Sequence, residues 1–158
     1  MEKKIFLLAD DDVDDREMFC EALHTINKNI ICEAAADGRQ MLSKLNNLDT
    51  LPQLIFLDIN MPVMSGWQCL EHLKADDKYK SIPVVIISTS SHQREIDIAQ
   101  KLDALCYFVK PHHFNDLIHI LQTMIANLGP GLAPALCHLE ANGSQYIRLL
   151  SSGDKSAC

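Results

Sequence analysis

The stretch LIFLDINMP, from Leu54 to Pro62, combines a short apolar run with a single acid. Residues 54–57 are all apolar, and Ile59 follows Asp58 directly. Such a run is typical of a buried β-strand. An ionised carboxylate at the end of a buried strand is costly to desolvate unless it has a partner. Asp58 therefore predicts a polar site at the end of this strand, with partners from elsewhere in the chain.

Similar apolar runs alternate with segments of helical periodicity on both sides of this stretch. The predicted strands are 4–9, 30–35, 54–57, 82–88 and 105–109. Apolar residues recur at helical spacing within 19–26, 41–48, 67–73 and 114–125, and a less amphipathic helix is expected at 92–102. Five strands alternating with five helices predict an α/β fold, a doubly wound parallel sheet with helices on both faces.

The composition is that of an ordinary globular protein, with 47% hydrophobic and 22% charged residues among 158. A net charge of −7 disfavours a nucleic-acid backbone as the main partner, because phosphate binding needs a basic face. No leader-like segment and no run of the roughly 18 apolar residues needed to span a membrane is visible, which predicts a cytoplasmic protein without a membrane partner.

Six cysteines are scattered through the chain, mostly within apolar runs. They are Cys20, Cys32, Cys69, Cys106, Cys137 and Cys158. Because none forms a CxxC pair, free buried thiols in a reducing compartment are favoured over a disulfide framework or a zinc site.

A change in amino-acid composition after Leu128 marks the end of the predicted domain, 3–128. The segment GPGLAP at 129–134 begins with a glycine and a proline, which is a helix stop signal. Residues 129–158 are too few for a separate output domain. Three alternatives stay open for this C-terminal appendage: a weakly structured tail, a small element packed on the domain, and a segment added by cloning.

Polar side chains follow four of the five predicted strands. They are Asp10, Asp11 and Asp12 after the first strand, Asp58 after the third, Ser88 at the end of the fourth, and Lys110 after the fifth. The carboxyl ends of parallel strands form the ligand-binding edge of such a sheet. Neighbouring carboxylates repel each other, and a hard divalent cation such as Mg²⁺ resolves that conflict. Asp10 and Asp11 are the expected metal ligands. Asp58 is the expected acceptor of a phosphoryl group, with Lys110 and a hydroxyl stabilising its charge.

Other readings compete at several of these positions. Asp14 and Asp15 are expected to cap the following helix or favour its positive end. For Asp12, a role as metal ligand and a solvated or capping role both stay open. Taken alone, Asp58 could be a satisfied turn acid and Lys110 a solvated lysine. The convergence of several polar groups on one edge favours a functional site.

Four motifs together resemble the receiver domain of bacterial two-component response regulators. They are LLADDD, LIFLDINMPVMSGWQCL, IPVVIISTSS and YFVKP, in the order of that family. The resemblance covers about 3–128, and the acidic start and lack of an output domain are similar to single-domain regulators of the phytochrome-associated type. It implies a flavodoxin-like fold with a five-stranded sheet in the order 2-1-3-4-5.

The resemblance also implies residue roles. Asp58 would accept a phosphoryl group from a histidine kinase or phosphotransfer protein, Ser88 would be the switch hydroxyl, and Lys110 would contact the phosphoryl group. Mg²⁺ would bind Asp10, Asp11, Asp58 and the backbone carbonyl of Asn60. Tyr107 would be a rotating aromatic coupled to Ser88, with plain packing as the equal alternative.

Several local features follow from the same likeness. Gly66 would let the loop after Asp58 turn tightly, and the Lys110–Pro111 peptide would be cis. The glycine usual before the fifth strand is replaced by Asp103, which questions the conformation of that loop. His112 and His113 are expected to be solvated residues at a helix start.

The expected function is that of a phosphorylation switch, not an enzyme beyond its own phosphorylation and dephosphorylation. Its output would be a downstream protein or a homodimer through the surface formed by 92–102, 105–109 and 114–125. The alternatives are a pseudo-receiver acting by constitutive contact and a Mg²⁺-dependent phosphohydrolase.

Overall fold

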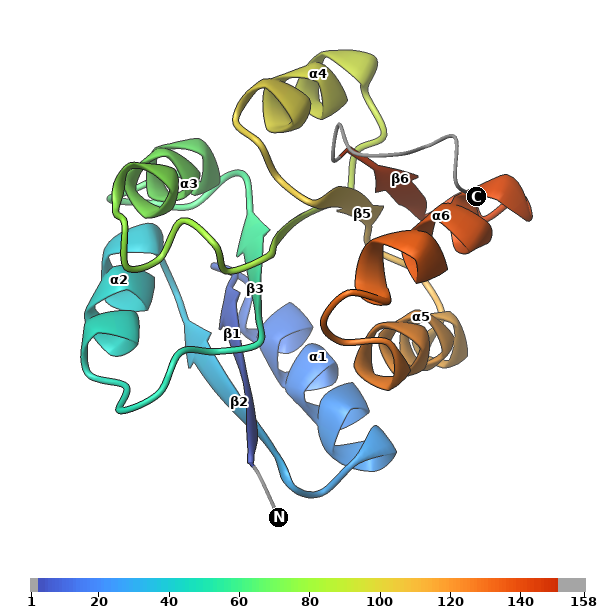
Figure 1. The fold of residues 1–158 in the computed structure, drawn as a ribbon, viewed down its shortest axis with the longest axis horizontal. Coiled ribbons are helices and arrows are strands. Elements are labelled where there is room, and N and C mark those ends of the chain that lie inside the picture. Colours follow the sequence, from blue (N-terminus) through green and yellow to red (C-terminus); the bar gives the residue numbers. More distant parts are fainter. Residues whose placement is uncertain (1–2, 151–158) are drawn as a thin grey trace.

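Six strands form one sheet in the order β2-β1-β3-β4-β5-β6 in the computed structural model, which describes residues 3–150 (Figure 1). The strands are β1 (Lys4–Ala9), β2 (Ile30–Ala35), β3 (Leu54–Asp58), β4 (Val84–Ser88), β5 (Cys106–Val109) and β6 (Ile147–Leu149). Strands β1 to β5 pair in parallel, in the predicted order, and β6 pairs antiparallel with β5. The five-stranded prediction is confirmed for the core and wrong in omitting the sixth strand.

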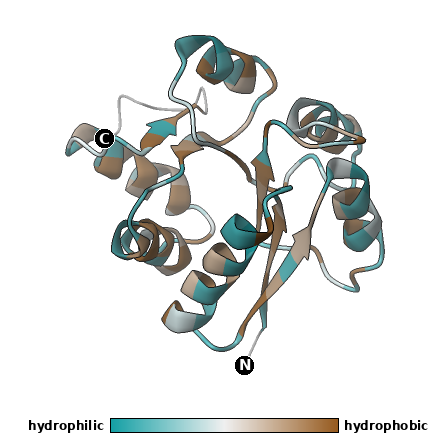
Figure 2. Ribbon diagram, turned by 180° about the vertical axis from the view of Figure 1, so that it is seen from behind, coloured by the Kyte–Doolittle hydropathy of each residue, from teal (hydrophilic) through white to brown (hydrophobic). Residues whose placement is uncertain are grey.

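Helices cover both faces of the sheet. They are α1 (Val13–Ile26), α2 (Gly38–Asn46), α3 (Gly66–Ala75), α4 (Gln93–Lys101), α5 (Phe114–Ala126) and α6 (Leu132–Ala141). Buried residues of α1, α5 and α6 form one apolar cluster with the sheet, and those of α2, α3 and α4 form the other. The hydrophobic strands and the helices with hydrophilic outer sides are visible in Figure 2. Burial on both faces explains why the parallel strands are continuous apolar runs.

Short polar side chains set the starts of three helices. Asp12, Asp37 and Ser65 are the N-caps of α1, α2 and α3, and each side chain accepts a hydrogen bond from the backbone N–H three residues later. Of the alternatives left open for Asp12, the structure shows the capping role. Such caps satisfy one of the free N–H groups at a helix start.

The segment after residue 128 contributes a helix and a strand to the domain. Leu132 and Leu136 of α6 and Ile147 and Leu149 of β6 are buried in the same cluster as α5. The β6 strand covers the outer edge of β5, with Arg148 opposite Tyr107. Within 129–150, the structure has a small element packed on the domain. Residues 151–158 lie outside the described part.

Three cysteines differ from the expectation of free thiols: Cys20, Cys32 and Cys137 are all disulfide-bonded. Cys20 of α1 and Cys32 of β2 form a disulfide, with their Cα atoms 5.7 Å apart. The prediction was wrong here because residues 12 positions apart in sequence become neighbours only once α1 packs beside β2. Cys69 and Cys106 are free and buried, as predicted, and Cys158 lies outside the described residues.

The backbone departs from expectation at two loops. No cis peptide bond occurs in residues 3–150, so the Lys110–Pro111 prediction is wrong. Trans is the intrinsically favoured form even before proline. Asp103 has a φ of 65°, the left-handed conformation that glycine adopts freely and that aspartate tolerates better than most residues. The loop before β5 thus keeps a glycine-like conformation without glycine.

Candidate functional site

The carboxyl edge of the sheet brings together polar residues from four strands. Asp10 follows β1, Asp58 ends β3, Ser88 ends β4 and Lys110 follows β5. Backbone hydrogen bonds hold the two outer positions: the N–H of Asp10 donates to Ala35 O at 3.0 Å, and the N–H of Lys110 donates to Ser88 O at 2.8 Å. The predicted convergence at one edge is therefore present in the fold.

Three carboxylates lie close enough to share one cation. Asp10, Asp11 and Asp58 each offer an oxygen, and these oxygens lie within 4.8 Å of one another. Asp10 is buried, Asp58 is mostly buried and Asp11 is exposed. Carboxylate oxygens are the ligands that hard divalent cations prefer, and an exposed member leaves room for bound water. The cluster could therefore hold a divalent metal ion.

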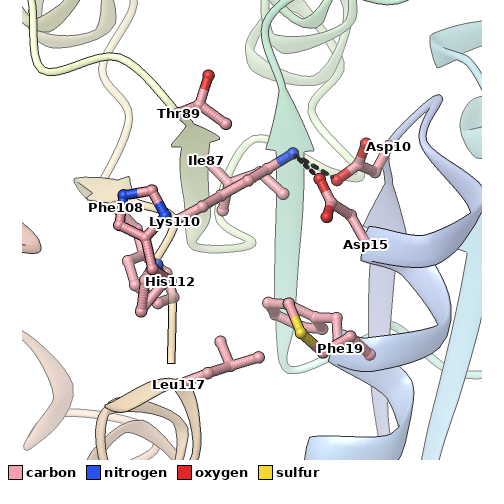
Figure 3. A pocket seen from close by; sticks show the side chains of 11 residues that line it. Asp10, Asp15, Phe19, Ile87, Thr89, Phe108, Lys110, His112 and Leu117 are labelled. Atoms are coloured by element: carbon pink, nitrogen blue, oxygen red, sulfur yellow. Dashed lines mark hydrogen bonds and ion pairs between the residues drawn. The ribbon is translucent and has the colours of Figure 1, made fainter. Parts of the chain in front are cut away.

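Lys110 is the cationic partner of this cluster. Its Nζ lies 2.7 Å from Asp10 Oδ2, 2.9 Å from Asp15 Oδ2 and 3.2 Å from Asp58 Oδ2. Figure 3 shows the lysine side chain extended across the site, with its ammonium group directed at Asp10 and Asp15. The side chain is only 17% exposed, so these contacts are well shielded from water. Lys110 is therefore not a solvated surface lysine.

Two neighbouring carboxylates, those of Asp10 and Asp58, lie beside one ammonium group, that of Lys110. Burial raises the pKa of Asp58 to about 6; Lys110 opposes this rise and Asp10 adds to it. For Lys110, burial alone would lower the pKa, but hydrogen bonds to Asp10 and Asp15 and the charge of Asp58 outweigh it and raise the pKa. Asp58 is thus a carboxylate whose negative charge needs further compensation.

A close backbone approach positions Asp58. A Cβ atom added at Gly66 would overlap the carbonyl oxygen of Asp58. The N–H of Gly66 donates to Ile59 O at 2.9 Å, and Asp58 Oδ1 accepts from the N–H of Ile59 at 2.7 Å. Glycine is therefore required at 66 because the start of α3 lies directly against the end of β3.

Ser88 and Tyr107 lie inside the protein. Ser88 Oγ accepts a hydrogen bond from the N–H of Ser90 at 3.0 Å. Tyr107 is fully buried, and its hydroxyl contacts Ser90 O and Glu95 Oε2, both at 2.8 Å. Burial raises the pKa of the Tyr107 hydroxyl, so it is a neutral donor. The ring therefore occupies an inward position tied to the loop after β4 and to α4.

Asp14 and Asp15, at the start of α1, have different environments, contrary to expectation. Asp14 is exposed in the first turn of the helix, whereas the Asp15 side chain binds Lys110, so the purely helix-terminal role expected for Asp15 is wrong. The sequence carried no signal for this pair, because the two residues are 95 positions apart and Asp15 does not follow a strand. Asn60, His112 and His113 are exposed, the last two at the start of α5.

A cavity of about 230 Å³ adjoins Lys110 between α1 and the start of α5. Asp10, Asp15 and Lys110 line its polar end, and Phe19 and Leu117 lie in its apolar part (Figure 3). The site therefore opens toward α1 and α5 on one side.

Comparison with known proteins identifies the family. Residues 6–122 match the model of the response regulator receiver domain, and the chain belongs to this family of two-component signalling proteins. The chain is 28% identical over 124 residues to response regulator Rcp1 of Synechocystis sp., covering 75% of this chain and 84% of that protein.

Solved structures agree with this assignment. The phosphorylated cyanobacterial phytochrome response regulator RcpA superposes with a TM-score of 0.70 at 28% identity, covering 77% of this chain and 90% of that one. The Mn²⁺-bound form of response regulator Rcp1 superposes with a TM-score of 0.68 at 27% identity, covering 78% and 92%. The chain is thus a receiver-domain response regulator that resembles the phytochrome-associated, single-domain type. Within residues 3–150, no helix is long and apolar enough to cross a membrane.

Proposed function

We propose that this protein accepts a phosphoryl group on Asp58 from a phosphohistidine of a sensor kinase or phosphotransfer protein. The observation that carries the proposal is the meeting of Asp10, Asp11, Asp58 and Lys110 at one edge of the sheet. Asp10 and Asp58 belong both to the three-carboxylate cluster and to the Lys110 contacts, and of the two Asp58 has the more accessible side chain, 13% exposed against 2%.

The transfer forms one bond and breaks another. An oxygen of ionised Asp58 attacks phosphorus, the O–P bond forms, and the N–P bond of the phosphohistidine breaks. The imidazole leaves with the electron pair of that bond and takes up a proton. Lys110, 3.2 Å from Asp58 Oδ2, neutralises charge on the transferred group, which is the main means of catalysing phosphoryl transfer.

Asp10, Asp11 and Asp58, with the backbone carbonyl of Asn60, would hold the divalent cation, which we propose is Mg²⁺. Bound there, the ion would compensate negative charge on the carboxylates and the phosphoryl oxygens. The chemistry of the donor set fits this ion, because Mg²⁺ takes oxygen ligands and needs only one or two carboxylates besides water.

Ser88 and Tyr107 are the proposed switch. A phosphoryl group on Asp58 would attract the Ser88 hydroxyl, which now accepts from Ser90 N–H. Since Tyr107 binds Ser90 O and Glu95, a shift of the loop after β4 changes the anchoring of the ring and of α4. The two-state element is therefore the surface around α4 and β5.

A downstream protein is the proposed reader of this surface, and a homodimer is the other candidate. The β6 strand occupies the outer edge of β5, so either partner would meet α4, β5 and β6 together rather than an open strand edge. The cytoplasmic location remains a prediction from the sequence.

Intact mass after incubation with acetyl phosphate and Mg²⁺ tests the proposal. We expect the mass of one phosphoryl group to be added to the wild type but not to Asp58→Ala. Asp14→Asn is the matched control, since it removes an exposed acid near the site and should leave the mass increase intact. No increase in the wild type, or the same increase in Asp58→Ala, would overturn the proposal.

The two alternatives have distinct outcomes in the same assay. A pseudo-receiver would gain no mass and would bind its partner equally with and without Mg²⁺ and phosphodonor. A phosphohydrolase would release many phosphates per protein from a generic phosphate ester. A single, Asp58-dependent addition excludes both.

A further inference from the structure

The Lys110 ammonium has as many carboxylate acceptors as it has protons. A lysine ammonium carries three N–H donors, and Asp10, Asp15 and Asp58 accept at 2.7, 2.9 and 3.2 Å. With the side chain 17% exposed, these three acids account for the orientation of Nζ. Any group that arrives at the site must replace one of them.

The three acids differ in their roles at the site. Asp10 and Asp58 belong to the set of oxygens within 4.8 Å that could hold a divalent cation, and Asp58 is the proposed acceptor. Both would therefore change partners when cation and phosphoryl group arrive. Asp15 is outside that set and lies on α1, so it can keep its contact with Lys110 throughout.

Two further hydrogen bonds order the first turn of α1, and the second of them ties it to the end of β1. Asp12, the N-cap, accepts from the N–H of Asp15 at 3.0 Å. Arg16 Nη1 donates to the carbonyl oxygen of Asp10 at 2.6 Å. Asp15 therefore presents its carboxylate from a helix turn anchored to the end of β1, and it restrains a long, flexible lysine side chain that would otherwise sample many rotamers.

We infer that Asp15 is a positioning residue that holds the Lys110 ammonium in the site while Asp58 gains and carries a phosphoryl group. The inference rests on the function proposed above. It assigns Asp15 no contact with the reacting atoms. Its contribution is to keep the lysine charge where the phosphoryl oxygens must meet it, in the manner of a pre-organised electrostatic group.

The test is the rate of Asp58 phosphorylation by acetyl phosphate and by phosphoramidate, at saturating Mg²⁺. We expect Asp15→Ala to lower the maximal rate about tenfold, because one charged hydrogen bond is worth roughly that factor, with little change in half-saturation by the donor. Asp15→Asn keeps an acceptor oxygen for Lys110 and should recover part of the loss. Asp14→Ala removes an equal charge from the same turn and should leave the rate near that of the wild type.

A double-mutant cycle separates positioning from general effects of charge or folding. If Asp15 acts through Lys110, Asp15→Ala should cause no further loss in a Lys110→Ala background. Thermal unfolding of each variant, followed by circular dichroism, verifies that the variants are folded.

The contrary results are distinct. Equal rates for Asp15→Ala and Asp14→Ala, or an undiminished effect of Asp15→Ala in the Lys110→Ala background, would overturn the inference while leaving the proposed function intact. No phosphorylation of wild-type Asp58 would remove the proposed function itself.

Discussion

At the scale of single residues, Asp58 shows how burial changes the charge properties of an acid. It sits at the end of an apolar strand, its side chain is 13% exposed, and burial raises its pKa to about 6. A carboxylate in this state is only partly compensated by Lys110. The uncompensated charge of Asp58 lowers the stability of the folded protein, and a bound cation can supply the missing compensation.

The raised pKa predicts that Asp58→Asn stabilises the cation-free protein. The folded pKa, about 6, exceeds the ordinary value of 3.8, so the folded state binds the proton more tightly than the unfolded state. Stability from this group is present below pH 3.8 and is lost as pH rises through 6. Asp58→Asn should therefore be more stable than the wild type by about 1–3 kcal/mol at pH 7.5, and the gap should close near pH 4.

Urea unfolding in the presence of a chelator measures this difference at both pH values. Adding Mg²⁺ at pH 7.5 should then stabilise the wild type more than Asp58→Asn, because a ligand that binds only the folded state adds to its stability. A variant less stable than the wild type at pH 7.5 would contradict the prediction.

One physical rule accounts for the part of the site that could be predicted from the sequence. Residues that follow parallel strands meet at one edge, and this rule located Asp10, Asp58, Ser88 and Lys110. Asp15 follows no strand, and an acid in the first turn of a helix has an adequate explanation in the helix dipole. Only the packing of α1 against the sheet reveals its contact with Lys110.

At the scale of elements, the strands that could be predicted from the sequence are those that are buried on both faces of the sheet. The five parallel strands are continuous apolar runs, whereas β6 is only three residues long and includes the exposed Arg148. Its pairing comes from position, since α6 packs beside α5 and returns the chain to the edge of β5. The Cys20–Cys32 disulfide was missed for a similar reason, because it depends on how α1 lies beside β2.

The disulfide predicts a measurable and non-additive loss of stability when either cysteine is removed. Cys20→Ala, Cys32→Ala and the double variant should each lose about 3 kcal/mol, as expected for a cross-link that closes a short loop in the unfolded chain. Urea unfolding under non-reducing conditions provides the values. If the two single losses were small and simply added in the double variant, the bond would not form in solution.

At the scale of the whole molecule, the C-terminal segment up to residue 150 belongs to the hydrophobic core. The cluster that joins α1, α5 and the sheet continues into α6 and β6, and Leu136 is fully buried within it. Backbone bonds tie β6 at both ends, from Val109 N–H to Tyr146 O and from Leu150 N–H to Leu105 O. The proposed signalling surface next to β5 is therefore built partly by residues that follow the family match.

Leu136→Ala distinguishes an integral C-terminal element from a loosely attached tail. If α6 packs on the domain as described, removing a fully buried leucine side chain should cost about 2–5 kcal/mol through lost burial and the cavity left behind. Leu51→Ala is the matched control, because Leu51 is 46% exposed and its truncation should cost well under half as much. Urea unfolding followed by tyrosine and tryptophan fluorescence gives both values, and a single cooperative transition is expected for each variant. Equal, small losses would mean that α6 is detached in solution, and the surface beside β5 would then be an open strand edge available for pairing with a partner.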